Sequence, residues 1–491
     1  MKHSNLFQLK HIRHTLVCGA VLLFSSCAIG YDSDLTFSPG VTNAQLESPQ
    51  ADEVTVTKDA KETQLTVTWP VVIGAGGYEF SMYNVDDPDN PVAVGQEKEV
   101  IDGCTTTRSL QADTQYKIVI RTLGNAQYNN AEAKTATEIS YTTLVPTYKT
   151  IPAGDISAWF EENPIPDDRV GEELAYVLES GASYTMSKAI DFGKQKVTFR
   201  GDKTRHAAIT MAKDARISTT AGLKIKFITF DCTAFDGASS TGALLLLSST
   251  PDESIKGTGD YYIINDPVVI QSCEVRGLPR HLVYDNKKKY CLSTLLIDGC
   301  DVELTTTQEQ SVIYFNQGFA NNMTVENSTF WHNGTKANKC FLEYNGSARP
   351  TRAGFAKGSV NYLNSTFYHV CYNKQWGNYN GMAGQSSVEW VMKNNIFVDC
   401  GKGEVARRLL GSRKPDGKNV IATFGNNTYW YNGAFSDGEK DYDNSGKYIE
   451  TDPMLKDPAH GDCTVGGAEQ IAARTGASKW LPKESTETEA Q

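Results

Sequence analysis

One short pattern recurs through the second half of the chain: an apolar residue, a polar turn, and a second apolar residue five positions on. It is clearest in two near copies, NSTFWHNG at 327–334 and NSTFYHVC at 364–371. Successive copies begin 40, 27, 28, 37, 30 and 32 residues apart. A constant core with a varying period is typical of a solenoid that carries loop insertions. The pairs are Phe230/Phe235, Ile270/Val275, Ile297/Val302, Val325/Phe330, Tyr362/Phe367, Met392/Phe397 and Phe424/Tyr429.

The repeating unit is rich in β-branched and aromatic residues and lacks the periodicity of an α-helix. A second apolar stretch follows in several copies: HLVYDN at 281–286, SVIYFN at 311–316 and CFLEYN at 340–345. Strands stacked coil upon coil would place equivalent residues about 4.8 Å apart. The sequence therefore predicts an all-β chain in which residues 150–482 form a right-handed parallel β-helix.

Asparagine recurs two positions after the first apolar residue, and a small residue recurs one position later. Stacked Asn side chains can hydrogen-bond along the axis, as in cross-β ladders. Small side chains suit a tight inner corner, so the cysteines there are expected to be buried free thiols, with a disulfide as the alternative. The positions are Asn327, Asn364, Asn394 and Asn426, and then Cys273, Cys300, Ser328 and Ser365.

Residues 1–26 have the features of a targeting segment, a basic start followed by an apolar run that is too short to span a bilayer. FSSC at 24–27 resembles a bacterial lipobox and predicts a lipid on Cys27, which would anchor the chain to an outer membrane. A plain secretory signal is the alternative. Residues 27–50 are expected to be a tether, and 483–491 a disordered tail.

Charge and cysteine spacing exclude two classes of partner. The formal net charge is −11, and near −14 without the three basic residues of the targeting segment. Such an acidic chain is a poor match for nucleic acid, although local basic patches can still meet an acidic glycan. No two cysteines have CxxC spacing, which argues against zinc.

Short alternating stretches fill residues 51–145 and predict a β-sandwich. QLTVTW, YEFSMY and LQADTQYKIVI resemble a fibronectin type III domain, with Trp69 as the core tryptophan and Leu110 with Tyr116 as the tyrosine corner. The resemblance implies a spacer or binding module.

The later residues also resemble a known group. SYTMSKAIDFGKQKVTFRGD, the repeated coils and DPMLKDPAHGDCTVGG resemble surface lipoproteins of gut Bacteroidota that carry pectate-lyase-like β-helix domains of unknown function. The resemblance implies a surface protein of a polysaccharide-utilisation system, in which other glycan-utilisation proteins would be partners. It implies no particular activity.

Seven positions after the aligned apolar residue stand His332, His369 and Asp399, on three consecutive coils. Stacking would bring two imidazoles and a carboxylate together. They are candidates for a base with an orienting acid, or for a metal site short of a ligand. A structural ladder of packed rings is the favoured interpretation.

Two further registers are candidates for glycan contact. An aromatic row, Trp331, Tyr368 and Trp430, would offer a platform for sugar rings if it faced outward. A basic register precedes the second stretch of three coils at Arg280, Lys339 and Arg407, with Arg276 and Arg408 close by. Arginine can pair with uronate carboxylates, so Arg280 and Arg407 are also candidate catalytic residues. The alternatives are packing under a cap for the first row and solvated edge charges for the second.

These features favour a surface-anchored lipoprotein that engages an extracellular, anionic polysaccharide. A uronate lyase, for which Ca²⁺ would be the candidate cation, and a structural or adhesive surface protein are the alternatives. No coil shows an Asp cluster or a paired-Asp motif, so the sequence predicts no metal site and leaves catalysis open.

Overall fold

The computed structural model describes residues 40–59, 63–236, 242–346, 348–379 and 381–483. They fall into two compact units that divide between Thr143 and Leu144. The expected targeting segment, including Cys27, and most of the expected tail lie outside the described residues. Within the described part of the chain, no helix is long and apolar enough to cross a membrane.

The first unit consists of two antiparallel sheets around a shared core. Trp69 stacks on Phe80 with ring centroids 5.8 Å apart, and the Tyr116 hydroxyl accepts a hydrogen bond of 2.7 Å from the Gln111 amide. One sheet has the order β1 (Thr55–Lys58), β2 (Gln64–Thr68), β6 (Thr105–Ser109). The other has the order β4 (Val92–Ala93), β3 (Tyr78–Asn84), β7 (Gln115–Thr122), β8 (Thr137–Thr142), with β5 (Glu99–Ile101) beside β3.

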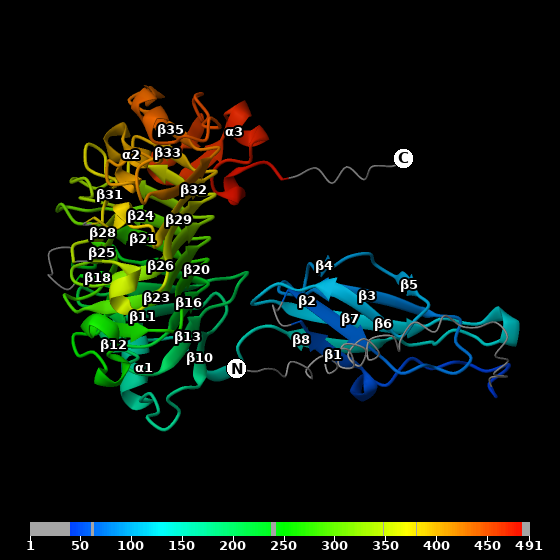
Figure 1. The fold of residues 1–491 in the computed structure, drawn as a ribbon. Helices are drawn as coiled ribbons and strands as arrows, with labels where there is room; N and C mark the ends of the chain where they lie inside the picture. The colour runs from blue at the N-terminus through cyan, green and yellow to red at the C-terminus, as the bar shows by residue number, and fades with distance from the viewer. Residues whose placement is uncertain (1–39, 60–62, 237–241, 347, 380, 484–491) are drawn as a thin grey trace, which may run out of the picture. The chain divides into compact units, whose positions relative to one another are not determined.

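The second unit is a parallel β-helix with three long sheets around one continuous core (Figure 1). Sheet 1 is β9 (Thr147–Ile151), β10 (Glu173–Leu178), β13 (Lys196–Arg200), β16 (Leu223–Lys226), β20 (Val268–Gln271), β23 (Tyr290–Asp298), β26 (Phe319–Glu326), β29 (Gly358–Leu363), β32 (Val388–Lys393) and β34 (Ile421–Gly425), with β19 (Tyr262–Ile264) beside β23. The predicted all-β fold class is confirmed.

Each turn of the coil continues from sheet 1 into sheets 2 and 3. Sheet 2 is β11 (Ser183–Met186), β14 (Ala207–Met211), β17 (Ile228–Asp231), β21 (Glu274–Leu278), β24 (Asp301–Leu304), β27 (Thr329–His332), β30 (Thr366–Tyr368), β33 (Ile396–Val398), β35 (Thr428–Tyr431) and the antiparallel β36 (Ala434–Phe435). Sheet 3 is β12 (Ala189–Asp191), β15 (Arg216–Thr219), β18 (Ala243–Leu247), β22 (His281–Tyr284), β25 (Ile313–Phe315), β28 (Leu342–Tyr344) and β31 (Gly377–Asn378).

The predicted apolar columns are confirmed from the second pair onward. The first members stack on sheet 1, all buried: Ile270, Ile297, Val325, Tyr362, Met392 and Phe424. Their partners stack on sheet 2. The pair Phe230/Phe235 is wrong: Phe230 pairs with Val275 on sheet 2, and Ile225 is the residue opposite Ile270. Ile225 and Phe230 are themselves five apart, so the pattern holds in a different frame.

The asparagine position forms the turn from sheet 1 to sheet 2. Asn394 Nδ2 donates to Asn364 Oδ1 (2.9 Å) and Asn426 Nδ2 to Asn394 Oδ1 (3.1 Å), which confirms the ladder there. Asn327 instead lies 3.4 Å from a carboxylate oxygen of Asp298. All four have a φ between 46° and 56°, a region that Asn tolerates better than most residues.

The cysteines behave as small core residues. All nine in the described residues are free thiols, and all except Cys104 are buried, as expected for the inner corner and the core. Burial raises the pKa of Cys232, Cys291 and Cys400, so these thiols stay protonated and unreactive.

Short helices and the chain end close the coil. Asp155 is the N-cap of α1 (Ile156–Glu162), and its carboxylate accepts a hydrogen bond from the Ser157 amide (2.8 Å). The helix buries Phe160 against the first coil. At the other end α2 (Val405–Leu409) follows β33. β37 (Leu455–Asp457), β38 (Asp462–Val465) and α3 (Ala468–Ala472) come last, and Figure 1 shows α3 beside the final coils.

Residues 451–482, called here the C-terminal cover, pack on the outer face of sheet 2. Val465 and Leu481 form an apolar cluster with Ile396 of β33. The Trp480 indole N–H donates to the Thr329 hydroxyl (2.8 Å), and the Ala477 amide donates to the Thr366 hydroxyl (3.0 Å). These contacts remove a sheet face from solvent that would otherwise be open.

Candidate functional site

A hollow of about 300 Å³ lies beside sheet 3 and is named the cationic hollow. Lys339 and Lys374 stand three residues before β28 and β31, whose pairing of Leu342 with Gly377 puts the two lysines at the same register. Lys402 reaches the hollow from a turn, where its φ is 61°. Cys340, Gln375 and Asn378 complete the lining.

Four cations meet two carboxylates here. Lys339 Nζ lies 2.6 Å from Glu343 and Lys374 Nζ lies 2.5 Å from Glu309. The Arg408 guanidinium donates to the Gln375 side chain (2.6 Å) at the rim, and Lys402 is exposed. The hollow is therefore locally positive in a chain whose formal net charge is −11.

Two of these groups have shifted pKa values. Partial burial alone would lower the pKa of Lys339, but the hydrogen bond and charge of Glu343 outweigh it and raise the pKa. The hydrogen bond from Lys374 lowers the pKa of Glu309. Lys339 therefore stays protonated at neutral pH, which suits an anion-binding role better than that of a base.

A buried polar chain holds Lys339 in place. Glu343 is almost fully buried, and it accepts a hydrogen bond of 2.5 Å from the Ser311 hydroxyl as well as the one from Lys339. His281 Nδ1 lies 2.6 Å from the Ser311 carbonyl oxygen, which can only accept, so the ring donates. Burial lowers the pKa of His281 to about 3, and the ring is neutral.

The other two members of the predicted basic register do not line the hollow. Arg280 is buried two coils away, where burial lowers its pKa. Arg407 lies in α2, where its guanidinium donates to Glu404 (2.6 Å) and its amide to Glu439 (3.1 Å). The assignment of Arg407 to the register is wrong because Arg407 lies within α2 and sheet 3 ends one coil earlier, at β31, which Lys374 precedes. Sequence comparison misses Lys374 because the short β31, Gly377–Asn378, lacks the apolar signature of earlier coils.

The doubled motif does form neighbouring coils, as predicted. Thr329 pairs with Thr366, and the rings of His332 and His369 stack with centroids 6.1 Å apart. Asp399 is next in line, where its carboxylate accepts from the Asn432 amide (2.7 Å) and raises the pKa of His369 against the larger effect of burial, which lowers it.

His332 is packed inside this ladder and is 3% exposed. Its Nε2 lies 2.9 Å from the Lys336 carbonyl oxygen and 2.8 Å from the Thr306 hydroxyl. Burial lowers its pKa to about 4, and the charge of His369 adds a smaller effect in the same direction. A ring this enclosed offers little surface to a polysaccharide, so its burial favours the structural ladder for His332.

The aromatic row is not the exposed platform that the sequence suggested. Trp331 is 2% exposed, because Gly461 of the C-terminal cover lies against its ring and the Arg276 guanidinium lies 5.3 Å from the ring centroid. Tyr368 and Trp430 are half-buried on the same face of sheet 2. Packing under a cap, the alternative, describes Trp331.

The register also reveals a carboxylate pair that motif reasoning missed. Asp298 of β23 pairs directly with Glu326 of β26, and burial together with the Asp298 charge raises the pKa of Glu326. Both acids stand one position after the aligned apolar residue, so the repeat alignment contains the signal.

The described residues contain no group of three or more His, Cys, Asp or Glu side chains that could hold a metal ion. Calcium, which belongs only to the lyase alternative, stays untested.

Three family models match successive parts of the chain, all described as domains of unknown function: DUF4992 over residues 1–181, DUF4957 over 182–333 and DUF5123 over 360–480. None spans half of the chain. No curated protein matches.

Among solved structures, pectate lyase Pel3 from Pectobacterium carotovorum matches at 12% identity with a TM-score of 0.18, covering 79% of this chain and 92% of that one. Pectate lyase PelI from Erwinia chrysanthemi, in complex with tetragalacturonic acid, matches at 8% identity with a TM-score of 0.14, covering 60% and 86%. Likenesses this distant say nothing of activity. The β-helix assignment rests on the strand order itself.

Proposed function

We propose that the chain binds an extracellular anionic polysaccharide through the cationic hollow. The observation that carries the proposal is the convergence of Lys339, Lys374 and Lys402, with Arg408 at the rim, on one concave site. A carboxylate or sulfate group placed there would meet several ammonium donors. Charge-assisted hydrogen bonds of this kind are roughly twice as strong as neutral ones.

The proposal includes a location. A lipid on Cys27 would hold the protein at the outer surface of an outer membrane, where other glycan-utilisation proteins would be its partners. FSSC at 24–27 supports this part. Metabolic labelling with a fatty-acid analogue tests it: label in the wild type and none in Cys27→Ala is expected, and equal label in both would refute the anchor.

The binding test uses the double variant Lys374→Ala/Lys402→Ala. We expect it to weaken binding to polygalacturonate or to a sulfated galactan at least tenfold, about 1.4 kcal/mol. The matched control is Lys188→Ala/Lys213→Ala, which removes the same charge from exposed lysines outside the hollow. An equal loss of affinity in both double variants would show that binding depends on net charge and not on the hollow. No binding by the wild type would favour the structural or adhesive alternative.

Catalysis is the rival interpretation and is measured in the same samples. A uronate lyase would release unsaturated products that absorb in the ultraviolet. The protonated Lys339 and the buried Arg280 are poor general bases, so we expect binding without such absorbance. Product formation that is lost with Lys374→Ala would replace the binding proposal with the lyase.

A further inference from the structure

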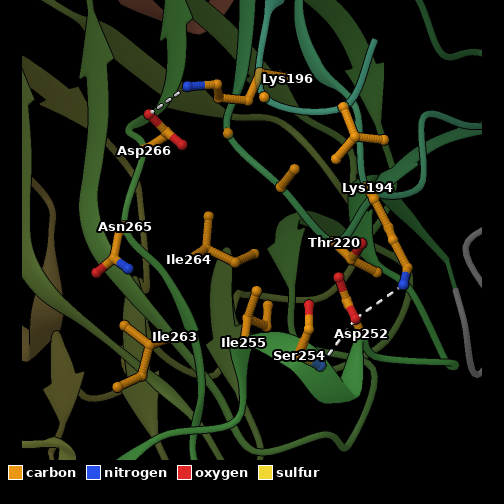
Figure 2. Close-up of a pocket in the computed structure, with 14 residues that line it drawn as sticks. Lys194, Lys196, Thr220, Asp252, Ser254, Ile255, Ile263, Ile264, Asn265 and Asp266 are labelled. Carbon is orange, nitrogen blue, oxygen red and sulfur yellow. Dashed lines mark hydrogen bonds and ion pairs between the residues drawn. The ribbon is translucent and has the colours of Figure 1, made fainter. Parts of the chain in front are cut away.

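A second hollow, of about 250 Å³, lies where the insertion between β18 and β20 folds back against the coil (Figure 2). The insertion supplies Asp252, Ser254 and Ile255, and then β19 with Ile263 and Ile264. The coil supplies the turn Thr220–Ala221–Gly222 and the start of β13. None of these residues lines the cationic hollow.

Two ion pairs stand on different sides of this hollow, as Figure 2 shows. Lys196 Nζ lies 3.3 Å from Asp266, and Lys194 Nζ lies 3.0 Å from Asp252. Burial alone would raise the pKa of Asp252, but hydrogen bonds from Ser254 and Lys194 lower it below its ordinary value. Each cation is matched by an anion, so the lining carries no net charge.

Apolar and polar groups alternate across the same surface. Ile264 lies in the middle of the lining in Figure 2, and Ile255 and Ile263 line the same hollow. Thr220 and Ser254 add hydroxyl groups. The lining therefore offers hydrogen-bond donors and acceptors around aliphatic side chains.

The hollow is shaped by a close approach of two segments. A Cβ on Gly222 would come within 2.5 Å of the Asp266 Cβ, so only glycine lets Asp266 lie against the turn. The hollow also adjoins a larger one of about 430 Å³, which shares Ser254, Ile255, Ile263 and Asn265 with it and is lined by Phe355 as well. A chain longer than one unit could continue from the first into the second.

We propose that this hollow is a subsite for an uncharged, polyhydroxylated sugar unit, separate from the anion-binding site. A pyranose ring combines hydroxyl groups that both donate and accept with faces of C–H groups, which matches paired charges around isoleucines. A free anion or cation gains little here, because its charge would meet a counter-charge that is already paired. This inference does not depend on the cationic hollow.

Two variants test it. Ser254→Trp places a bulky ring at an exposed position on the wall and blocks the hollow, while Asp266→Ala removes one half-exposed acceptor. The probes are uncharged oligosaccharides of glucose, galactose, mannose and xylose, titrated by calorimetry and by ligand-observed NMR. At least one is expected to bind the wild type with a Kd of about 1 mM and to bind each variant about tenfold more weakly.

Lys374→Ala/Lys402→Ala is the matched control and is expected to bind the neutral probe like the wild type. Thermal unfolding of each variant shows that the coil is intact. The proposal is overturned if no uncharged probe binds the wild type, or if Ser254→Trp binds as well as the wild type does. Loss in the lysine control as well would place the neutral probe in the cationic hollow and would also overturn it.

Discussion

The β-helix carries two polar registers that look alike in sequence and differ in their surroundings. His332 and His369 recur at one position on sheet 2, and Lys339 and Lys374 recur at one position before the strands of sheet 3. His332 is buried at the end of β27, where its ring lies against the Thr306 hydroxyl, the Lys336 carbonyl and the ring of His369. The second pair lines a hollow open to solvent.

The difference shows that a recurring register alone does not identify a site. Stacking in a β-helix guarantees that equivalent residues are neighbours, whether they form a ladder or a binding surface. Access is decided by what packs on the outer face. For sheet 2 that is Trp480 and its neighbours, which are far away in the sequence.

The largest expected effect on stability is at Trp331, which lies under the C-terminal cover. Trp331→Ala should lower the free energy of unfolding by about 3–5 kcal/mol, because the indole fills a space between β27 and Gly461. Denaturant unfolding measures the loss, and binding of polygalacturonate to the folded variant should be unchanged. Weaker binding by a variant of normal stability would make the aromatic row a platform after all.

A second test uses pH. The pKa of His332 is about 4 in the folded chain and about 6.5 when unfolded, so the unfolded chain binds the extra proton between these values. This contribution to stability is complete above pH 6.5 and is lost as the pH falls to about 4. The difference between the two pKa values corresponds to about 3 kcal/mol in the free energy of unfolding.

Unfolding curves of the wild type and His332→Gln between pH 7 and pH 4 measure this contribution. His332→Gln should flatten the dependence of the free energy of unfolding on pH. An identical slope in both proteins would show that His332 is accessible to protons in the folded state.

A smaller effect is expected at the outer end of the ladder. His369 is half-buried and stacks on Tyr372 with centroids 4.3 Å apart, so His369→Ala should cost about 1 kcal/mol. Thermal unfolding measures it. Loss of glycan binding at normal stability would move His369 from the ladder to the site.

The smallest effect on stability is expected in the cationic hollow. Lys374→Ala and Lys402→Ala should each change the free energy of unfolding by no more than about 0.5 kcal/mol, because exposed ion pairs contribute little. Their effect should appear in the salt dependence of polygalacturonate binding. Added salt screens the charges and should weaken binding by the wild type. It should weaken binding by the variants less, because each has lost a charge that salt would screen. A large stability loss would make these lysines structural.

Local pattern alone determined much of this protein. Pairs such as Ile297 and Val302 recur with constant spacing, and that is enough to predict a coil with a buried column on each of two sheets. The asparagine ladder from Asn364 to Asn426 follows from the same alignment. A shift of one residue would move every side chain to the other face, so the buried column fixes the register of the asparagines as well.

The tertiary structure alone decided which repeated residues meet solvent. Trp331 is covered by Gly461, which lies more than a hundred residues later in the chain, and no local pattern specifies that contact. Lys374 and Lys402 come together with Lys339 from coils whose lengths differ, so their sequence spacing carries no signal. Burial in this fold is a property of packing between distant segments, whereas stacking is a property of the repeat.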